Sequence, residues 1–317
     1  MSGIEQKPEN KPIRVSVVIP SKDSLTISDA LQSIAVSASR DPSLPVEVIL
    51  VDSSSNFPAV SSEITDRVDL RVIHKNLTRF EARVEGIRSA RGDFILNLDA
   101  DQKVHPDLLH ALVQTTANSV VIFELPTESG RWDQLVHRTK LYELAEFRRH
   151  PSVELPVIPR WYHREPLMKA VELLVDVAAQ NQGHLPTRHE DTILFWYFLK
   201  ANRWTAKDSV GFADLPIYHP VPPLDETGRK FFRYGKELGV ESRRIRRGES
   251  AIDPHAWRTV YRLDYRRLVS YWVSELGWNL PGLVYDLYRA CFYGAGVVVG
   301  YGAQPSGNHG KSENQRL

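Results

Sequence analysis

Two carboxylates separated by a single residue follow directly on an apolar run of the chain. Asp99 and Asp101 come after residues 93–98, whose sequence DFILNL is typical of a buried strand. Side chains two positions apart in extended backbone point to the same side, so both carboxylates can meet one cation. Their oxygens are ligands that Mg²⁺ and Mn²⁺ prefer, and these ions keep further positions for water and phosphate. An isolated pair of this kind is more often a solvated turn, so its surroundings decide between the two interpretations.

A second pair of acids stands before an apolar segment that is typical of a buried helix. Glu190 and Asp191 follow His189 and precede residues 193–199, with the sequence ILFWYFL. A carboxylate held beside a hydroxyl can accept its proton while the oxygen attacks another centre. Acids in the first turn of a helix also satisfy free N–H groups and suit the helix dipole, which would lower their basicity. The residues alone leave both interpretations open.

The later half of the chain offers further candidates for binding a metal ion or a phosphate. His219 is a candidate metal ligand because neutral imidazole can bind Mn²⁺, although a lone histidine is more often structural. Residues 230–236 interleave bases with aromatics, and Lys230 and Arg233 could face anionic oxygens there. The alternative for this segment is an amphipathic helix that packs its aromatic face.

Strands that alternate with helices are expected to position these groups. The alternation predicts a mostly parallel sheet covered by helices on both faces. Ligands of such sheets bind beyond the carboxyl ends of the strands. Asp23, Asp52 and the Asp99/Asp101 pair all follow strand ends, so we expect them to converge on one crevice. The expected strands are residues 13–20, 46–52, 69–74, 93–98 and 119–124, and residues 25–39 have helical spacing.

Composition and charge exclude several classes of protein. The chain has 317 residues with 42% hydrophobic and 25% charged side chains, which is ordinary for a globular protein. A formal net charge of +1 argues against a nucleic-acid partner. The single cysteine, Cys291, excludes an intramolecular disulfide framework, as expected for a cytoplasmic protein. No uncharged apolar run of about 18 residues is present, so no conventional membrane span is expected.

Basic and aromatic residues gather late in the chain. Aromatics flanked by bases suit a membrane interface, which predicts docking on an anionic membrane surface at its cytoplasmic side. Packing of the same helices against the rest of the protein is an equally weighted alternative. The bases are Arg243, Arg244, Arg246 and Arg247, and an apolar, glycine-rich stretch at residues 294–302 follows the aromatics.

The order of these segments resembles that of the family 2 glycosyltransferases, which have the GT-A fold. That family has a first strand like residues 15–20 and a strand ending in Asp like residues 46–52. A helix then ends in a sequence like ARGDF at residues 90–94, and a strand leads into an Asp-x-Asp motif. Residues 83–101 match this order closely, and the resemblance is strongest over residues 13–113.

The resemblance implies an α/β GT-A fold, Rossmann-like, with a mostly parallel central sheet flanked by helices and a C-terminal helical extension. It implies a metal-dependent transferase that moves a sugar from a nucleotide-diphosphate sugar to a hydroxyl of a sugar, a lipid-linked molecule or a small molecule. The transfer would invert the anomeric centre. Asp191 would be the general base, and the neighbouring Glu190 would complete the acidic pair.

The resemblance also implies roles for the other candidates. Pro20, Ser21 and Asp23 would edge the nucleoside pocket, and Asp52 would contact the base or ribose. Two departures leave the identity of the base open, because Lys22 replaces a frequent aromatic and Ser53 a frequent second Asp. The remaining roles are Arg79 or Arg83 at the nucleotide, Asp99 at the ribose or at the metal through water, Asp101 and His219 as metal ligands, and Lys230 and Arg233 at the diphosphate.

Three alternatives stay open beside this interpretation. One is a retaining GT-A glycosyltransferase. Another is a nucleotidyltransferase, which should carry a glycine-rich phosphate loop after the first strand, whereas residues 21–24 (SKDS) contain no glycine. The third is a catalytically silent sugar-binding partner, which the presence of Asp99, Asp101 and Asp191 disfavours.

We expect five segments along the chain. They are a disordered N-terminus at 1–12, a nucleotide-sugar and metal-binding half at 13–124, an acceptor-binding half at 125–240, a C-terminal helical and membrane-associated region at 241–303, and a disordered tail at 304–317.

Overall fold

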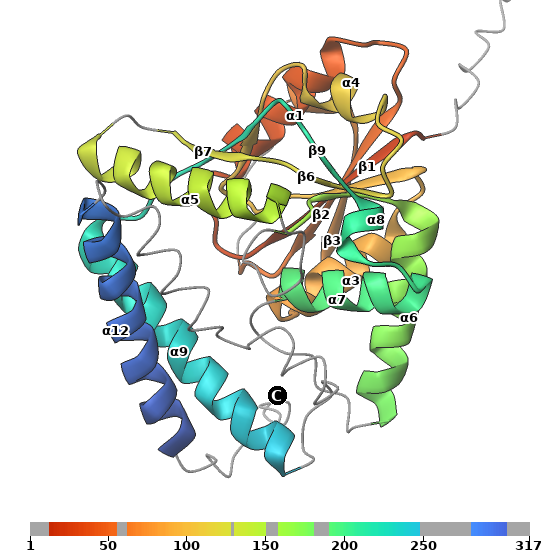
Figure 1. Cartoon of the computed structure of the whole chain (residues 1–317). Coiled ribbons are helices and arrows are strands. Elements are labelled where there is room, and N and C mark those ends of the chain that lie inside the picture. The colour runs from red at the N-terminus through yellow and green to blue at the C-terminus, as the bar shows by residue number, and fades with distance from the viewer. Residues whose placement is uncertain are drawn as a thin grey trace, which may run out of the picture.

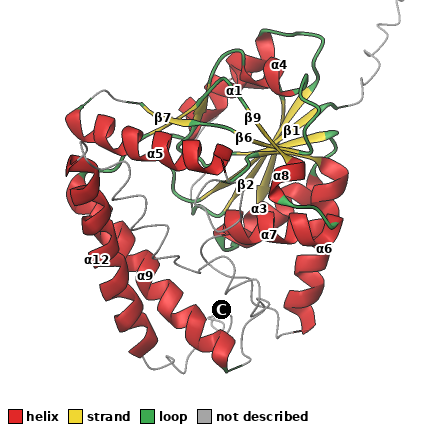
Figure 2. Cartoon of the chain, viewed as in Figure 1, coloured by secondary structure: helices red, strands yellow, loops and turns green. Residues whose placement is uncertain are grey.

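A seven-stranded sheet lies at the centre of the fold, with helices on both of its faces (Figures 1 and 2). The structure is a computed structural model that describes residues 13–55, 62–127, 130–149, 158–180, 190–247 and 280–302. The strand order is β3-β2-β1-β4-β8-β6-β9. The strands are β1 (Val15–Ser21), β2 (Val46–Asp52), β3 (Asp69–His74), β4 (Phe94–Asn97), β6 (Ser119–Val121), β8 (Trp161–His163) and β9 (Val210–Phe212).

One strand of this sheet, β8, runs opposite to all the others. β3, β2, β1 and β4 run parallel, which agrees with the alternation of strands and helices in the sequence. β8 runs antiparallel to both β4 and β6, and β9 is parallel to β6. The carboxyl ends of β1, β2 and β4 therefore lie at one edge of the sheet. This is the mostly parallel, helix-covered sheet that the sequence predicts.

Helices cover the two faces of the sheet in unequal numbers. α1 and α4 lie on one face, whereas α3, α6 and α7 lie on the other (Figure 1). The helices are α1 (Ile27–Ser39), α2 (Ser62–Thr65), α3 (Arg79–Ser89), α4 (Leu108–Leu112), α5 (Arg131–Arg149), α6 (Arg164–Gln180), α7 (Glu190–Asn202), α8 (Ala206–Ser209), α9 (Leu224–Arg246) and α12 (Leu280–Gly302).

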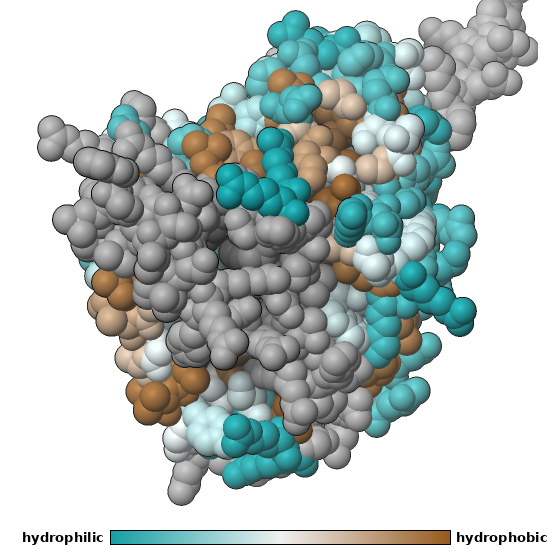
Figure 3. Space-filling model, viewed as in Figure 1, coloured by the Kyte–Doolittle hydropathy of each residue, from teal (hydrophilic) through white to brown (hydrophobic). Residues whose placement is uncertain are grey.

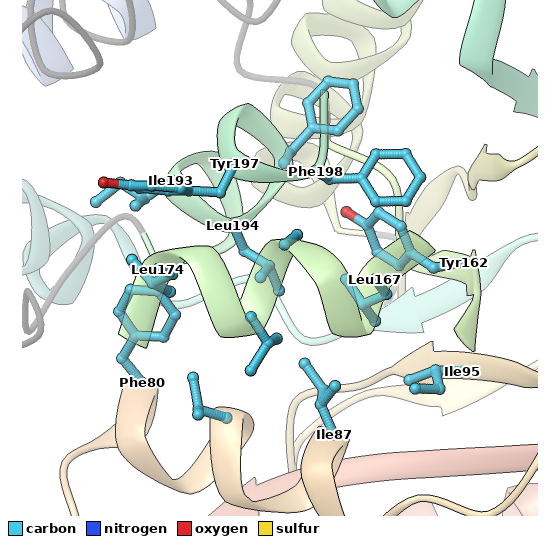
Figure 4. Close-up of a cluster of buried hydrophobic side chains, with 14 of the residues drawn as sticks. Phe80, Ile87, Ile95, Tyr162, Leu167, Leu174, Ile193, Leu194, Tyr197 and Phe198 are labelled. Atoms are coloured by element: carbon cyan, nitrogen blue, oxygen red, sulfur yellow. The ribbon is translucent and has the colours of Figure 1, made fainter. Parts of the chain in front are cut away.

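Successive side chains of the central strands pack into two different hydrophobic cores. Val17 and Ile19 of β1 pack in the cluster beneath α1 and α4, whereas Val18 packs in the cluster with α3 and α6. Every residue of β1 and β2 is buried, as expected for parallel strands with both faces covered. In the second core α6 lies between α3 and α7, with Leu167 and Leu174 facing this layer (Figure 4).

A smaller sheet departs from the sequence-based expectation of one strand over residues 119–124. Two separate strands occupy this stretch, β6 in the large sheet and β7 (Glu124–Pro126) in a second sheet. The second sheet has the order β5-β10-β7, with β5 at Lys103–Val104 and β10 at Ile217–His219. The expected strand was therefore wrong at its end, because the chain leaves the large sheet after Val121 to pair β7 with β10.

Helices α9 and α12 form a close parallel pair beside the sheet (Figure 1). Glycines bring the two backbones together. A Cβ added at Gly235 would collide with the carbonyl oxygen of Tyr293, and one at Gly300 with that of Lys236. None of the helices in the described ranges is long and apolar enough to cross a membrane. The expected disordered termini at 1–12 and 304–317, and residues 248–279 of the expected C-terminal helical region, lie outside the described residues.

Replacing Gly300 by alanine is expected to destabilise the α9–α12 pair by about 1–3 kcal/mol, the usual cost of overpacking. The added methyl group has no room, because the nearest atoms belong to the Lys236 backbone. Gly294→Ala is the matched control, since nothing lies within 4 Å of a Cβ at that position. Urea unfolding followed by circular dichroism compares the two variants. Equal unfolding midpoints for both variants would contradict the close contact.

Candidate active site

The turn after β4 is held by hydrogen bonds from both sides. Leu98 N–H donates to the carbonyl of Val18 (3.0 Å), which ties the end of β4 to β1. Asp99 N–H donates to the side-chain oxygen of Gln102 (2.9 Å), and Gln102 N–H donates back to the Asp99 carbonyl (3.0 Å). Gln102 is completely buried. Sequence reasoning missed Gln102, although a Gln can accept from the backbone N–H three residues before it, as in a capping box.

Three arginines surround the carboxylate of Asp99. One oxygen, Oδ1, accepts from Arg79 Nη2 (2.6 Å) and from Arg83 Nη2 (2.8 Å). The other oxygen, Oδ2, accepts from Arg160 Nη2 (3.4 Å). Burial alone would raise the pKa of Asp99, but the arginines outweigh burial and hold that pKa well below its usual value. Asp99 is therefore a partly buried anion held at the edge of the sheet.

Helix α3 places two of these arginines by a well-defined N-terminus. Thr78 and Glu81 form a capping box, in which Thr78 accepts from Glu81 N–H and Glu81 accepts from Thr78 N–H. Gly86 lets the helix approach the sheet, because a Cβ there would collide with Val18. Arg83 is consequently completely buried, whereas the Arg79 side chain is 40% exposed.

The two acids at the start of α7 meet the same arginines. Glu190 Oε1 lies 2.7 Å from Arg79 Nε, and Asp191 Oδ1 lies 3.3 Å from Arg83 Nε. Burial and the neighbouring Asp191 raise the pKa of Glu190. The Asp191 side chain is 18% exposed and that of Glu190 only 6%, so Asp191 is the more accessible of the two. His189 lies outside the described residues.

Asp101 and His219 come together on the outer side of the turn. Nε2 of His219 lies 3.4 Å from Asp101 Oδ2, and its Nδ1 lies 3.6 Å from Glu124 Oε2. Burial lowers the pKa of His219, but Asp101 and Glu124 outweigh it and raise that pKa. Glu124 also accepts from Gln102 Nε2 (3.0 Å). Carboxylates on both sides thus hold the imidazole in place.

The donor set of Asp101 and His219 fits a divalent ion such as Mn²⁺. A carboxylate oxygen and an imidazole nitrogen face each other, and the Asp101 side chain is 45% exposed. Within the described ranges, no three His, Cys, Asp or Glu side chains are arranged to hold a metal ion. Two protein ligands are typical of ions that bind phosphate oxygens and water at their other positions. Asp99, which the sequence also predicts as a metal ligand, accepts hydrogen bonds from three arginines instead.

A second group of side chains lies at the ends of β1 and β2. Asp52 is completely buried and accepts from the Ser54 hydroxyl (2.7 Å) and from Ser54 N–H (3.3 Å). Asp23 adopts a left-handed backbone conformation (φ 51°), and its N–H donates to Ser54 Oγ (2.6 Å). Ser54 therefore links two predicted nucleoside contacts, although sequence reasoning missed it. Pro20 and Ser21, also predicted there, are the last residues of β1 and are buried.

This group adjoins the Asp99 turn. The hydroxyls of Ser24 and Thr26 each donate to the carbonyl of Ala100 (3.3 Å for both). The structure thus brings the residues that follow β1, β2 and β4 to one edge of the sheet.

Comparison with known proteins identifies the first half of the chain. Residues 16–168 match the model of Glycosyl transferase family 2. This segment belongs to glycosyl transferase family 2. The family 2 segment holds Pro20, Asp52, the Asp99 turn and Arg160, whereas Glu190 and the later candidates lie outside it.

Two curated proteins resemble parts of the chain. The succinoglycan biosynthesis protein ExoO of Rhizobium meliloti (strain 1021) is 30% identical over 41% of this chain and 38% of its own length. An N-acetylglucosaminyltransferase of Bradyrhizobium elkanii is 33% identical over 31% of this chain and 57% of its own length. The chain therefore spans less than two thirds of either relative.

Among solved structures, a mannosyltransferase from Pyrobaculum calidifontis in complex with GDP-Man and Mn²⁺ superposes with a TM-score of 0.52. The match covers 93% of this chain and 90% of that protein at 16% sequence identity. At this identity the likeness establishes the fold alone. The family 2 segment and its continuation thus form a GT-A fold, as the sequence resemblance implies.

Two further predicted residues, Lys230 and Arg233, belong to α9. Lys230 of α9 lies over the ring of Tyr234, 5.8 Å from its centroid, and Arg233 is exposed. Of the contacts between described residues, none joins Lys230 or Arg233 to the Asp99 cluster. Their role at a diphosphate stays a prediction.

Proposed function

We propose that the chain is a metal-dependent glycosyltransferase that moves a sugar from a nucleotide-diphosphate sugar to an acceptor hydroxyl. One observation carries this proposal: the Asp99 turn and the acids at the start of α7 lie in the same site. Arg83 and Arg160 each contact both Asp99, on the turn expected to bind the donor, and Asp191, the expected base. Donor and acceptor would therefore meet between the end of β4 and the start of α7.

The proposed reaction assigns each residue one task. Asp52 and the residues after β1 would bind the nucleoside, and Asp99 would face the ribose. Asp101 and His219 would hold Mn²⁺ or Mg²⁺, which neutralises the diphosphate leaving group when it is bound. Asp101 and Glu124 raise the pKa of His219, so a metal ion would compete with a proton for its nitrogen.

In the transfer step, the acceptor oxygen would attack the anomeric carbon as the bond from that carbon to the diphosphate oxygen breaks. The hydroxyl proton would pass to the carboxylate of Asp191. Attack opposite the leaving group would invert the anomeric centre. The more exposed position of Asp191 relative to Glu190 supports this assignment.

A donor screen tests this function. Uridine and guanosine diphosphate sugars with Mn²⁺ are added to the protein, and melting temperatures are compared with and without the metal. A ligand that binds the native state raises the melting temperature by mass action. Release of nucleoside diphosphate in the presence of sugar acceptors then distinguishes transfer from silent binding. A protein that binds no nucleotide sugar under any of these conditions would refute the proposal.

We propose in addition that the far end of the α9–α12 pair docks at the cytoplasmic face of an anionic membrane, where a lipid-linked acceptor would be found. Val298 is 73% exposed and Val299 48% exposed on α12. Hydrophobic surface lies on the side of the molecule where α12 runs (Figures 1 and 3). Arg246, at the end of α9, donates to the hydroxyl of Tyr301 (2.8 Å), so bases and apolar side chains share this end.

Removing the arginines of this end is expected to weaken binding to anionic vesicles strongly, since each contributes about 1 kcal/mol near such a surface. Co-sedimentation with vesicles of phosphatidylserine and phosphatidylcholine measures it at low and high salt, because salt screens this attraction. Equal partition of the variant and the unchanged protein at low salt would refute the electrostatic part. The variant carries alanine at 243, 244, 246 and 247, and its charge-matched control carries alanine at the exposed arginines 14, 40, 67 and 88.

A further inference from the structure

Arg160 is a buried arginine that the chemistry above leaves without a task. Its guanidinium contacts carboxylates from three separate elements. Nη1 donates to Asp191 Oδ2 (3.2 Å), and Nη2 donates to Glu124 Oε1 (2.9 Å) and to Asp99 Oδ2 (3.4 Å). The side chain is only 12% exposed. Such a cation joins the start of α7, the start of β7 and the turn after β4.

We infer that Arg160 is a positioning residue that sets the candidate base Asp191 at a fixed place relative to Asp99 and the bound donor. The inference rests on the proposed function, because it assigns to Arg160 the geometry of the transfer step. Effective attack requires the acceptor oxygen and its base to be held near the anomeric carbon, and a misplacement of about 1 Å can cost on the order of a hundredfold in rate.

The backbone of Arg160 is suited to this role because hydrogen bonds on both sides fix it to the sheet. Its N–H donates to the carbonyl of Val120 (3.0 Å), and its carbonyl accepts from Asn97 N–H (2.7 Å). Asn97 is the last residue of β4, two positions before Asp99. The strand that carries Asp99 is thus bonded directly to the residue whose side chain reaches Asp191.

The planar fork of an arginine is needed for these contacts. Its two terminal nitrogens point to different carboxylates, whereas the ammonium of a lysine is a single point charge. Burial opposes the charge on Arg160, but Asp99, Asp191 and Glu124 outweigh burial and raise its pKa well above the usual value. The guanidinium therefore remains charged across the working pH range.

Removing Arg160 would affect Asp99 and Asp191 differently, because the two arginines of α3 also contact these carboxylates. Arg79 and Arg83 both hold Oδ1 of Asp99, so this carboxylate keeps two partners when Arg160 is removed. Within the part of the chain that the structure describes, Asp191 would keep its contact to Arg83 Nε, at 3.3 Å. Loss of Arg160 should accordingly disturb Asp191 more than Asp99, and turnover more than donor affinity.

Steady-state kinetics and calorimetry of Arg160→Ala and Arg160→Lys test the inference. We expect kcat to fall by about 10- to 100-fold in the alanine variant, while the Kd of the donor changes by less than the loss in kcat. Guanidinium chloride at low millimolar concentration should restore part of the turnover of Arg160→Ala, because it supplies the missing guanidinium group. It should not restore Asp191→Asn. Lysine should recover little, since it cannot bridge the carboxylates.

Arg164→Ala is the matched control. Arg164 lies four residues on, and among the described residues its Nε donates to a backbone carbonyl, that of Ala90 (2.8 Å), and not to a carboxylate. Unchanged kcat in Arg160→Ala, or a kcat that falls without any guanidinium rescue, would overturn the inference. If the alanine variant does not fold, a folded Arg160→Lys with normal kcat overturns it equally. Absence of transfer by the unchanged protein with every donor would instead refute the proposed function.

Discussion

Replacing Asp191 by asparagine is expected to lower turnover by about a hundredfold or more, the usual contribution of a general base. Asparagine has nearly the size of aspartate but cannot accept the acceptor's proton. Donor affinity should stay near that of the unchanged protein, because Asp191 stands at the start of α7 and not among the residues after β1 and β2. Transfer kinetics at saturating donor, together with donor calorimetry, measure the two effects separately.

Glu190→Gln is the matched control for this prediction. Both acids lie in the first turn of α7, so each could simply stabilise the helix N-terminus. Glu190 is less exposed and contacts Arg79, and its replacement should reduce turnover less than that of Asp191. If both variants lost only stability, on the order of 1 kcal/mol, the pair would serve the helix alone. Near-normal turnover in a folded Asp191→Asn protein would remove Asp191 as the base.

Replacing Asp101 by asparagine is expected to abolish metal-dependent binding of the donor while the fold stays intact. The amide keeps one oxygen but loses the negative charge that attracts the ion, so His219 would be the one unchanged ligand of the facing pair. The side chain is 45% exposed, and its ion pair to His219 is long (3.4 Å), so little stability should be lost. Calorimetric titration of a nucleoside diphosphate with and without Mn²⁺ measures the effect.

Asp107→Asn is a suitable control for the loss of a nearby carboxylate. Asp107 is 56% exposed and lies 3.6 Å from Arg40, away from His219. This variant should keep the Mn²⁺ dependence of nucleotide binding. Unchanged Mn²⁺-dependent binding in Asp101→Asn would show that the metal is held elsewhere, and the assignment of Asp101 and His219 would then be wrong.

Local patterns of the sequence were sufficient to predict the elements that carry the site. The apolar run at β2 has the same bounds in the sequence and in the structure, because a strand buried on both faces needs continuous apolar residues. β3 also has the expected bounds, although it is the partly exposed edge strand of the sheet. The Asp99 turn follows β4 directly, and α7 begins at Glu190, as the spacing indicated. These features depend on neighbours in the chain, and the order of segments was enough to indicate family 2.

The partners of the site residues were decided only by the tertiary structure. Arg160 is 61 residues from Asp99 and 31 from Asp191, and its sequence context, a proline-rich segment before a short strand, gave no sign of either contact. Glu124 was expected to end one strand, but the break between β6 and β7 places it beside His219 and Arg160.

For the same reason, the role of Lys230 and Arg233 at the diphosphate stays a prediction. Bases between aromatics have the same spacing whether a helix faces a ligand or another helix. Here α9 packs along α12 through glycines, and this long-range contact, not the local pattern, determines where its side chains lie. Residue type and spacing thus determined which groups could do chemistry. Packing between distant segments decided which of them meet, because contacts across dozens of residues depend on how the sheet and helices assemble.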